Sequence, residues 1–154
     1  MSEITAIGDV TGDGYPDLMA VHTPTGTLRL YQGRGTSLVK RADLSTGRGE
    51  LDELAGVGDV DADGRGDVVA RVKATGALRL YSGRAGGLGP HREISTAGAT
   101  MRHLVGVGDF DRDGRADLMA ADTVTGAWFR YPIGPKGLGA GVRMSPGATG
   151  ALLS

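Results

Sequence analysis

One short motif recurs three times along the chain and constrains the fold more than any other feature. The copies are GDVTGDGYPDL from Gly8, GDVDADGRGDV from Gly58 and GDFDRDGRADL from Gly108, so the period is 50 residues. A fixed period of this length indicates a repeat architecture, in which each unit buries its apolar surface against its neighbours. We therefore divide the chain into units 1–50, 51–100 and 101–150, and expect residues 151–154 to begin a further innermost strand.

Each unit is predicted to form four short strands. In the second unit these are residues 54–58, 67–72, 77–81 and 90–95, and the alternation of Leu78, Arg79 and Leu80 is typical of a half-buried strand. Thr-Gly pairs at 25–26, 75–76 and 125–126 predict the hairpin turn between the second and third strands. No segment shows the 3.6-residue period of a helix.

These patterns predict an all-β fold of three four-stranded β-propeller blades. A solenoid is the alternative, but its strand-bearing repeats are typically shorter than 50 residues. The third unit departs from the pattern at AWFRYPIG, where an ungapped alignment places Arg130 at the inward position of Leu30 and Leu80. A one-residue shift instead aligns Arg130 with Arg29 and Arg79, and Gly134 with Gly33 and Gly83. We prefer the shift, because otherwise a charged side chain points into the core.

The repeated motif places oxygen-bearing side chains at positions 1, 3, 5 and 9, counted from its first aspartate, with glycine at position 6. Alternate oxygens before a sharp turn suit a hard cation with six to eight oxygen ligands. The predicted ligands, including the main-chain carbonyl at position 7, are Asp9, Thr11, Asp13, Tyr15 and Asp17; Asp59, Asp61, Asp63, Arg65 and Asp67; and Asp109, Asp111, Asp113, Arg115 and Asp117.

Calcium is the predicted cation, about three ions per chain and one per unit. The loop is not an EF-hand, because position 12 holds Ala20, Ala70 or Ala120 in place of the closing acid. Magnesium requires stricter octahedral geometry, and zinc prefers His or Cys ligands. The alternative is that the Asp-Gly pairs only form hairpin turns. The first loop is the weakest candidate, because it has Thr11 in place of a carboxylate and Pro16 stiffens it.

These three motifs, with TGTLRLY, TGALRLY and TGAWFRY behind them, resemble the FG-GAP/VCBS repeat family of integrin alpha-chain heads and secreted bacterial proteins. The resemblance covers nearly the whole chain. It implies propeller blades with calcium in the loop between the first two strands, but no single activity. Members of the family usually have six or seven blades, whereas this chain has three. We therefore expect two copies to complete a six-bladed ring as a homodimer.

The composition limits the chemistry. The formal net charge is −1, yet 11 of the 18 acidic residues lie in the three loops, which leaves 17 basic and 7 acidic residues elsewhere. The calcium-loaded chain is therefore expected to be mildly basic, which suits acidic glycans or anionic surfaces as partners, although solvated arginines on strand faces are the better explanation of the surplus. The histidines, His22, His91 and His103, fall at unrelated places in their units, and no serine-hydrolase or zinc-protease motif occurs. We predict that the chain is not an enzyme.

The remaining expectations concern location and partners. The chain has no apolar run of the roughly 18 residues that a membrane span needs and does not begin with a signal peptide, so it is either cytoplasmic or a mature region whose leader has been removed. The absence of cysteine does not decide between them. With the resemblance to secreted proteins, we expect an extracellular protein whose leader is absent from this sequence. We expect a glycan- or protein-binding module with no specific nucleic-acid partner. An ancillary domain of a secreted hydrolase and a purely structural assembly unit are the alternatives. Trp128, Phe129 and Tyr131 form the one aromatic cluster, which serves either as a sugar-binding face or as core.

Overall fold

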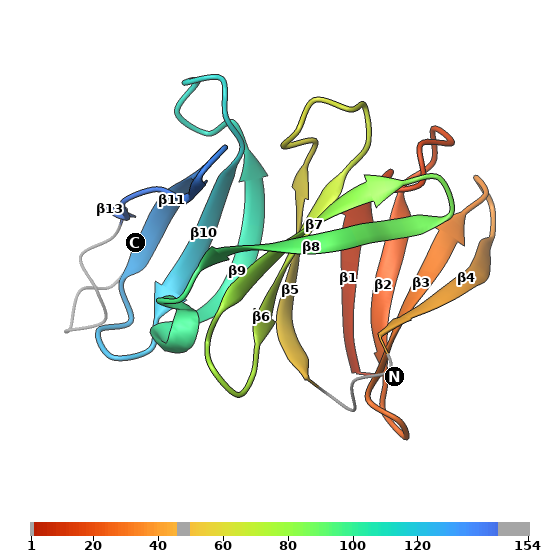
Figure 1. Ribbon diagram of the computed structural model, residues 1–154, viewed down its shortest axis with the longest axis horizontal. Helices are drawn as coiled ribbons and strands as arrows, with labels where there is room; N and C mark the ends of the chain where they lie inside the picture. The colour runs from red at the N-terminus through yellow and green to blue at the C-terminus, as the bar shows by residue number, and fades with distance from the viewer. Residues whose placement is uncertain (1, 46–49, 145–154) are drawn as a thin grey trace.

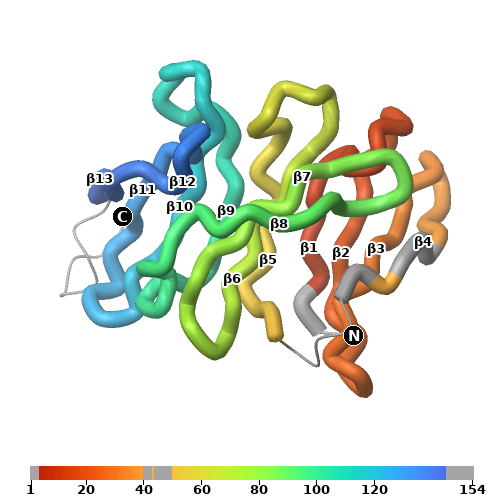
Figure 2. Tube along the Cα trace, in the orientation of Figure 1, coloured from red at the N-terminus to blue at the C-terminus, as the bar shows by residue number. Residues whose placement is uncertain are grey.

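The computed structural model describes residues 2–45 and 50–144. Within these ranges the regular structure is β-strand, apart from one 3-10 turn, η1 (Gly98–Thr100), so the all-β prediction is confirmed. The strands form three antiparallel sheets, which we call blades 1, 2 and 3, and none of the sheets closes on itself. The blades stand side by side in chain order (Figures 1 and 2).

Each blade arises within one of the 50-residue units. Blade 1 has the order β1 (Ser2–Gly8), β2 (Asp17–His22), β3 (Thr27–Gly33) and β4 (Leu38–Ser45). Blade 2 has the order β5 (Leu51–Gly58), β6 (Asp67–Val72), β7 (Leu78–Arg84) and β8 (Gly87–Ser95). Blade 3 contains β9 (Met101–Gly108), β10 (Asp117–Asp122), β11 (Trp128–Gly134), β12 (Gly137–Leu138) and β13 (Val142–Arg143).

Blade 3 differs from the predicted four-stranded pattern at its outer edge. Two short strands, β12 and β13, both pair with β11, where the other blades have one long fourth strand. The further strand expected at 151–154 lies outside the described residues.

The two kinds of repeated loop lie at opposite edges of the blades. The Thr-Gly turns join the second and third strands as predicted, and Gly26, Gly76 and Gly126 have φ values of 64°, 76° and 69°, which glycine adopts without steric cost. The three aspartate loops, between the first and second strands of each blade, all project from the upper edge in Figure 1. The fold therefore presents three copies of the same loop on one side of the molecule.

The predicted one-residue shift in the third unit is wrong. Arg130 pairs with Met119 in the same register as Leu30 with Met19 and Leu80 with Val69, so its side chain takes the position of these leucines. Phe129, and not Arg130, occupies the register of Arg29 and Arg79. In blade 3 this position lies on the face turned away from blade 2, because Leu118 and Tyr131 on the other face pack into the core between the two blades. An arginine is tolerated at this position because it forms ion pairs with two aspartates of the third loop.

Apolar side chains fill the spaces between the blades. One cluster joins blade 1 to blade 2 and includes Ile7, Met19, Leu30, Leu54 and Val68. A second cluster joins blade 2 to blade 3 and includes Val57, Leu78, Leu104, Leu118 and Ile133. Blade 2 thus buries both of its faces, and blades 1 and 3 each bury the face that lies against blade 2.

The innermost strands pack in chain order, β1 against β5 and β5 against β9, and at one residue of each junction their backbones come into contact. A Cβ atom added to Gly56 would lie 2.6 Å from the Cα of Ile7, and one added to Gly106 would lie 1.9 Å from the carbonyl oxygen of Gly56. Glycine is therefore required at both junctions. The matching residue in blade 1 is Ala6, which carries a Cβ atom.

A charged link also crosses from blade 2 to blade 3. The guanidinium of Arg71 on β6 forms a two-pronged ion pair with Asp52 on β5, with Nε–Oδ1 and Nη2–Oδ2 distances of 2.8 and 2.9 Å. Its Nη1 atom donates to the main-chain carbonyl of Met101, the first residue of β9. Arg71 therefore fixes the start of blade 3 against blade 2.

Candidate metal centre

The aspartates of the three loops hold the loop backbone in one shared pattern. The position-9 carboxylate accepts a hydrogen bond from the position-2 amide in every loop: Val10 to Asp17 at 3.0 Å, Val60 to Asp67 at 2.8 Å and Phe110 to Asp117 at 2.8 Å. The position-1 carboxylate accepts hydrogen bonds from the position-5 and position-6 amides in every loop. Part of the aspartate repeat is therefore explained by loop folding alone.

Two residues of each loop adopt left-handed backbone conformations. Gly14, Gly64 and Gly114 at position 6 have φ values of 88°, 86° and 87°. Position 4 is left-handed as well. In loops 2 and 3 it is occupied by Ala62 and Arg112, both with φ of 63°, although residues with a Cβ atom rarely adopt this conformation. These two turns bring position 5 and position 9 back toward the first aspartate.

Loop 2 (residues 59–67) brings three carboxylates together without a basic partner. One oxygen from each of Asp59, Asp61 and Asp67 lies within 4.8 Å of the others. Two oxygens bound to one calcium ion, each at 2.3–2.6 Å, are separated by at most about 5 Å. Asp67 is fully buried, while Asp59 and Asp61 face solvent. The residues of loop 2 therefore fit a calcium ion.

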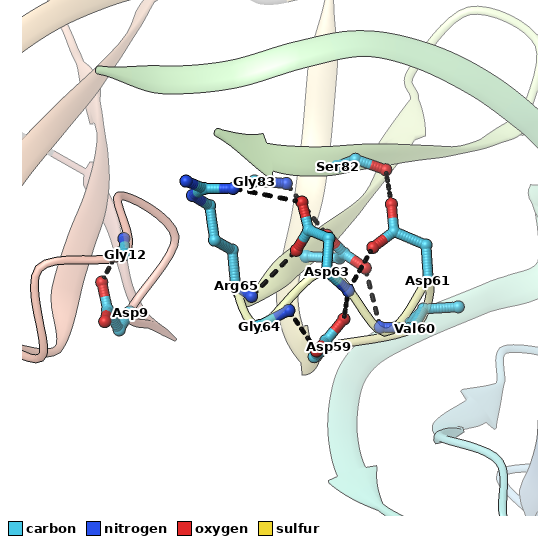
Figure 3. A network of polar contacts seen from close by, with 11 residues as sticks. Asp9, Gly12, Asp59, Val60, Asp61, Asp63, Gly64, Arg65, Ser82 and Gly83 are labelled. Carbon is cyan, nitrogen blue, oxygen red and sulfur yellow. Dashed lines mark hydrogen bonds and ion pairs between the residues drawn. The ribbon is translucent and has the colours of Figure 1, made fainter. Parts of the chain in front are cut away.

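Among the described residues, the hydrogen-bond donors to Asp59, Asp61 and Asp67 are neutral (Figure 3). Asp67 Oδ1 accepts a hydrogen bond from the amide of Gly83 at 2.9 Å, and Asp61 Oδ2 accepts one from the Ser82 hydroxyl at 2.8 Å. Burial raises the pKa of Asp67, the amides of Gly83 and Val60 lower it, and the charges of Asp61 and Asp59 raise it further, so the pKa lies above its ordinary value. The negative charge of this loop is thus incompletely neutralised.

The fourth aspartate of loop 2, Asp63 at position 5, makes different contacts. Its Oδ1 atom accepts a hydrogen bond from the Arg65 amide at 2.8 Å, and its Oδ2 atom lies 3.5 Å from Arg65 Nη1. The Arg65 side chain lies against loop 1, because a Cβ atom added to Gly12 would be 2.8 Å from Arg65 Nε. Asp63 is not part of the three-carboxylate group. The position-7 carbonyls of Tyr15, Arg65 and Arg115 stay a prediction.

Loop 1 (residues 9–17) has the same backbone pattern with fewer carboxylates. Thr11 at position 3 lies 3.5 Å from Asp9 Oδ1, and the amide side chain of Gln32 donates to Asp13 Oδ2 at 2.7 Å and to Thr11 Oγ1 at 3.4 Å. Asp17 is fully buried and accepts hydrogen bonds from main-chain amides. A cation bound here would have as ligands the carboxylates of Asp9 and Asp17 and the hydroxyl of Thr11. Asp13 could join them only if the Gln32 side chain moved away from its carboxylate.

Loop 3 (residues 109–117) contains the second three-carboxylate group, Asp109, Asp111 and Asp117. Here the Arg130 side chain reaches the group, with Nη1 2.8 Å from Asp111 Oδ2 and 2.9 Å from Asp117 Oδ1. The oxygens of the three carboxylates meet the distances for a metal ion, and two of the three also pair with this guanidinium.

The sequence-based prediction missed the groups that reach the loops from the third strands. Gln32, Ser82 and Pro132 each follow the tyrosine of their strand, and the first two donate to the position-3 or position-5 side chains. The recurrence of polar Gln32 and Ser82 at one register was the available signal. For Arg130 the available signal was a charged residue at the position of Leu30 and Leu80, which the prediction attributes to a one-residue shift of the strand.

The sequence that forms these blades and loops matches a known repeat family. The model of the FG-GAP-like repeat matches residues 9–70 and 59–120, which together cover more than half of the chain. The chain belongs to the FG-GAP-like repeat family. A search of curated proteins found no match. Membership supports a β-propeller-like repeat module, and FG-GAP repeat domains are generally non-catalytic.

The aromatic cluster does not form one sugar-binding face. Trp128 and Tyr131 lie on opposite faces of β11, because side chains alternate along a strand. Tyr131 packs against the core between blades 2 and 3, and its ring centroid lies 6.3 Å from that of Phe129. Tyr131 is therefore part of the core.

The described residues contain no helix with the length and apolar character needed to cross a membrane.

Proposed function

We propose that this FG-GAP-like chain is a calcium-stabilised, non-catalytic binding module that works outside the cell. The observation that carries the proposal is the group of Asp59, Asp61 and Asp67 in loop 2, whose oxygens lie within 4.8 Å of one another with neutral donors around them. Oxygen ligands of this number and charge suit calcium. The expectation of three ions requires all three loops to bind, and Arg130 sets loop 3 apart.

The electrostatics of loop 2 explain why a cation would stabilise the fold. The buried carboxylate of Asp67 faces the charges of Asp61 and Asp59, which raise its pKa. A calcium ion between them replaces this repulsion with attraction in a partly desolvated site. Because the site exists only in the folded chain, calcium adds about 2.7 kcal/mol of stability at a free concentration 100 times its dissociation constant.

Thermal unfolding with and without calcium tests the proposal. Chelation should lower the melting temperature of the wild-type chain, and added calcium should restore it. Asp59→Asn should weaken the calcium-dependent shift, whereas Asp43→Asn, which removes one exposed carboxylate from blade 1, should leave it unchanged. Identical melting curves in chelator and in calcium would refute calcium binding by this fold.

A surface pocket beside loop 1 favours a glycan as the bound partner. This pocket has a volume of about 450 Å³ and is lined by Tyr15, Arg34 and Leu38 among others, with Tyr15 47% exposed. An exposed aromatic ring beside a guanidinium can stack on a sugar and pair with its acidic groups. A pocket of about 410 Å³ in blade 3 has Arg115 and Lys136 but no aromatic side chain in its lining.

Variants in the two pockets test which of them binds a glycan. On an array of neutral and acidic glycans, in the presence of calcium, Tyr15→Ala should abolish binding and Arg115→Ala should preserve it. Equal loss in both variants would place the ligand elsewhere. If no glycan or protein ligand binds, the structural assembly unit becomes the better interpretation, and catalytic sequence in the full precursor would favour an ancillary domain of a secreted hydrolase.

Self-association belongs to the same proposal. Apolar side chains are exposed at both ends of the row of blades: Ile4 (62%) and Leu38 (50%) in blade 1, and Phe110 (52%) and Val142 (46%) in blade 3. Two copies joined end to end would cover them in a six-bladed homodimer. Light scattering should give twice the chain mass of 15.8 kDa, and a monomer at micromolar concentration would exclude the ring.

A further inference from the structure

One residue on the third strand of each blade lies beside the aspartate loop, on the face opposite the tyrosine that follows it. Leu30 and Leu80 fill this position in blades 1 and 2, where they are 0% and 3% exposed. Arg130 fills it in blade 3 and is 9% exposed. A buried guanidinium is costly unless it is paired, so its partners should account for its presence.

The partners of Arg130 are two of the three carboxylates that would hold a metal ion. Its Nη1 atom lies 2.8 Å from Asp111 Oδ2 and 2.9 Å from Asp117 Oδ1. Arg130 therefore brings a permanent positive charge into the group.

The same two oxygen atoms accept neutral donors in loop 2. Asp61 Oδ2, which corresponds to Asp111 Oδ2, accepts from the Ser82 hydroxyl. Asp67 Oδ1, which corresponds to Asp117 Oδ1, accepts from the Gly83 amide. Neither donor has an equivalent in blade 3.

Blade 3 has lost both donors through its sequence. Pro132 stands in the place of Ser82 and has no side-chain donor. Ile133 stands in the place of Gly83, and its amide donates to the carbonyl oxygen of Ala116 at 2.9 Å. One arginine thus takes over two hydrogen bonds and adds a positive charge.

We propose that Arg130 is the built-in cation of loop 3, so that loop 3 takes up no divalent ion and the chain binds calcium only in loops 1 and 2. A calcium ion in loop 3 would have to lie beside the guanidinium and share its carboxylates, which Coulomb repulsion disfavours. This inference rests on the proposed calcium binding of loop 2. If Arg130 neutralises loop 3, the stability of blade 3 does not depend on calcium.

A loop-resolved calcium titration tests the inference. The amides of Gly64 and Gly114 each donate to the position-1 carboxylate, at 2.7 and 2.9 Å, so their NMR resonances report on the occupation of their own loop. In the wild-type chain, calcium should shift the resonance of Gly64 and leave that of Gly114 in place. In Arg130→Leu, which installs the residue of the other two blades, the Gly114 resonance should shift too.

Equilibrium dialysis with metal analysis gives the second readout. Arg130→Leu should bind one more calcium ion per chain than wild type. Arg112→Leu removes the same charge from an exposed position of the same loop and should bind no additional ion. If Arg130→Leu does not fold, Arg130→Gln removes the charge and keeps a donor, and the same gain is expected.

The outcomes separate the two proposals. A wild-type chain in which Gly64 and Gly114 both shift refutes the role of Arg130 and leaves calcium binding intact. A chain in which only Gly64 shifts, both in wild type and in a folded Arg130 variant, also refutes it. Absence of any shift at Gly64 refutes calcium binding itself and, with it, this inference.

Discussion

The Cα atom of Gly106 packs so closely against the main-chain carbonyl of Gly56 that a Cβ atom at residue 106 would lie 1.9 Å from the carbonyl oxygen. Contacts below 3.0 Å are not found for real Cβ atoms, so the two innermost strands can approach this closely only with glycine at this position. At this residue β5 and β9 therefore meet backbone to backbone.

Gly106→Ala should destabilise the chain by about 1–3 kcal/mol, because β9 has to move away from β5 and loosen the core between the blades. Ala6→Gly, at the matching position of blade 1, should cost no more than about 1 kcal/mol, the backbone entropy of an added glycine. Urea unfolding followed by circular dichroism measures both. Equal losses would show that the inter-strand contact at Gly106 is not tight.

Asp67→Ala should destabilise the chain even without calcium. The change leaves the amides of Val60 and Gly83 without their acceptor, at about 1–3 kcal/mol for each buried group. Thr11→Ala should cost less, because its hydroxyl makes only contacts of 3.4–3.5 Å. Unfolding in excess chelator compares the two variants, and the order should persist in calcium. A larger loss for Thr11→Ala would reverse our ranking of the two loops.

Arg71→Met should weaken the attachment of blade 3. It removes the ion pair with Asp52, whose side chain is 22% exposed, and the hydrogen bond to the Met101 carbonyl, for an expected loss of about 1–3 kcal/mol. Arg79→Met is the matched change on the next strand. It breaks a 2.8 Å pair with Glu50, which is 47% exposed, and should cost at most about 1 kcal/mol. Hydrogen exchange should show faster opening of β9 in the Arg71 variant alone.

Asp122 predicts a pH dependence at the turn between β10 and β11. The amide and hydroxyl of Thr125, together with the Val124 amide, lower the pKa of Asp122, the Thr125 amide having the largest effect. The ionised group therefore stabilises the fold at pH values above the ordinary pKa of about 3.9, and this contribution is lost as the pH falls through the lowered pKa.

Unfolding at a series of pH values tests this. The stability difference between wild type and Asp122→Ala should be constant near neutral pH and should shrink in strong acid. Asp122→Asn keeps an acceptor but does not titrate, so the stability of this variant should lack that pH dependence. A difference that stays constant down to the lowest pH would contradict the lowered pKa.

Most of the fold could be predicted from the 50-residue repeat. The 50-residue period, the Thr-Gly turns and the alternation in the strands predict the three sheets, and the observed β6 matches the predicted 67–72. Local patterns of this kind report on backbone geometry within one unit. The two short strands at the edge of blade 3 have no such signal and were predicted as one.

The contacts of the candidate site were harder to predict, because they join residues far apart in the sequence. Arg130 lies 13 residues from Asp117 and 19 from Asp111, and a charge at an inward position suggests a misalignment when its partners are not known. The aspartate pattern did contain the three carboxylates that loop 2 brings together. It could not distinguish a carboxylate that faces a neutral donor from one that already has a cation.

Ala6 has a consequence for any ring that two copies would form. Gly56 and Gly106 let the two junctions within a chain close to backbone contact, whereas the methyl group of Ala6 would hold a junction between chains farther apart. The weakest points of such a ring would then be its two seams. A ring of this kind would separate into two intact three-blade chains before any blade unfolds, so its assembly would depend on the concentration of the chain while the fold of each blade would not.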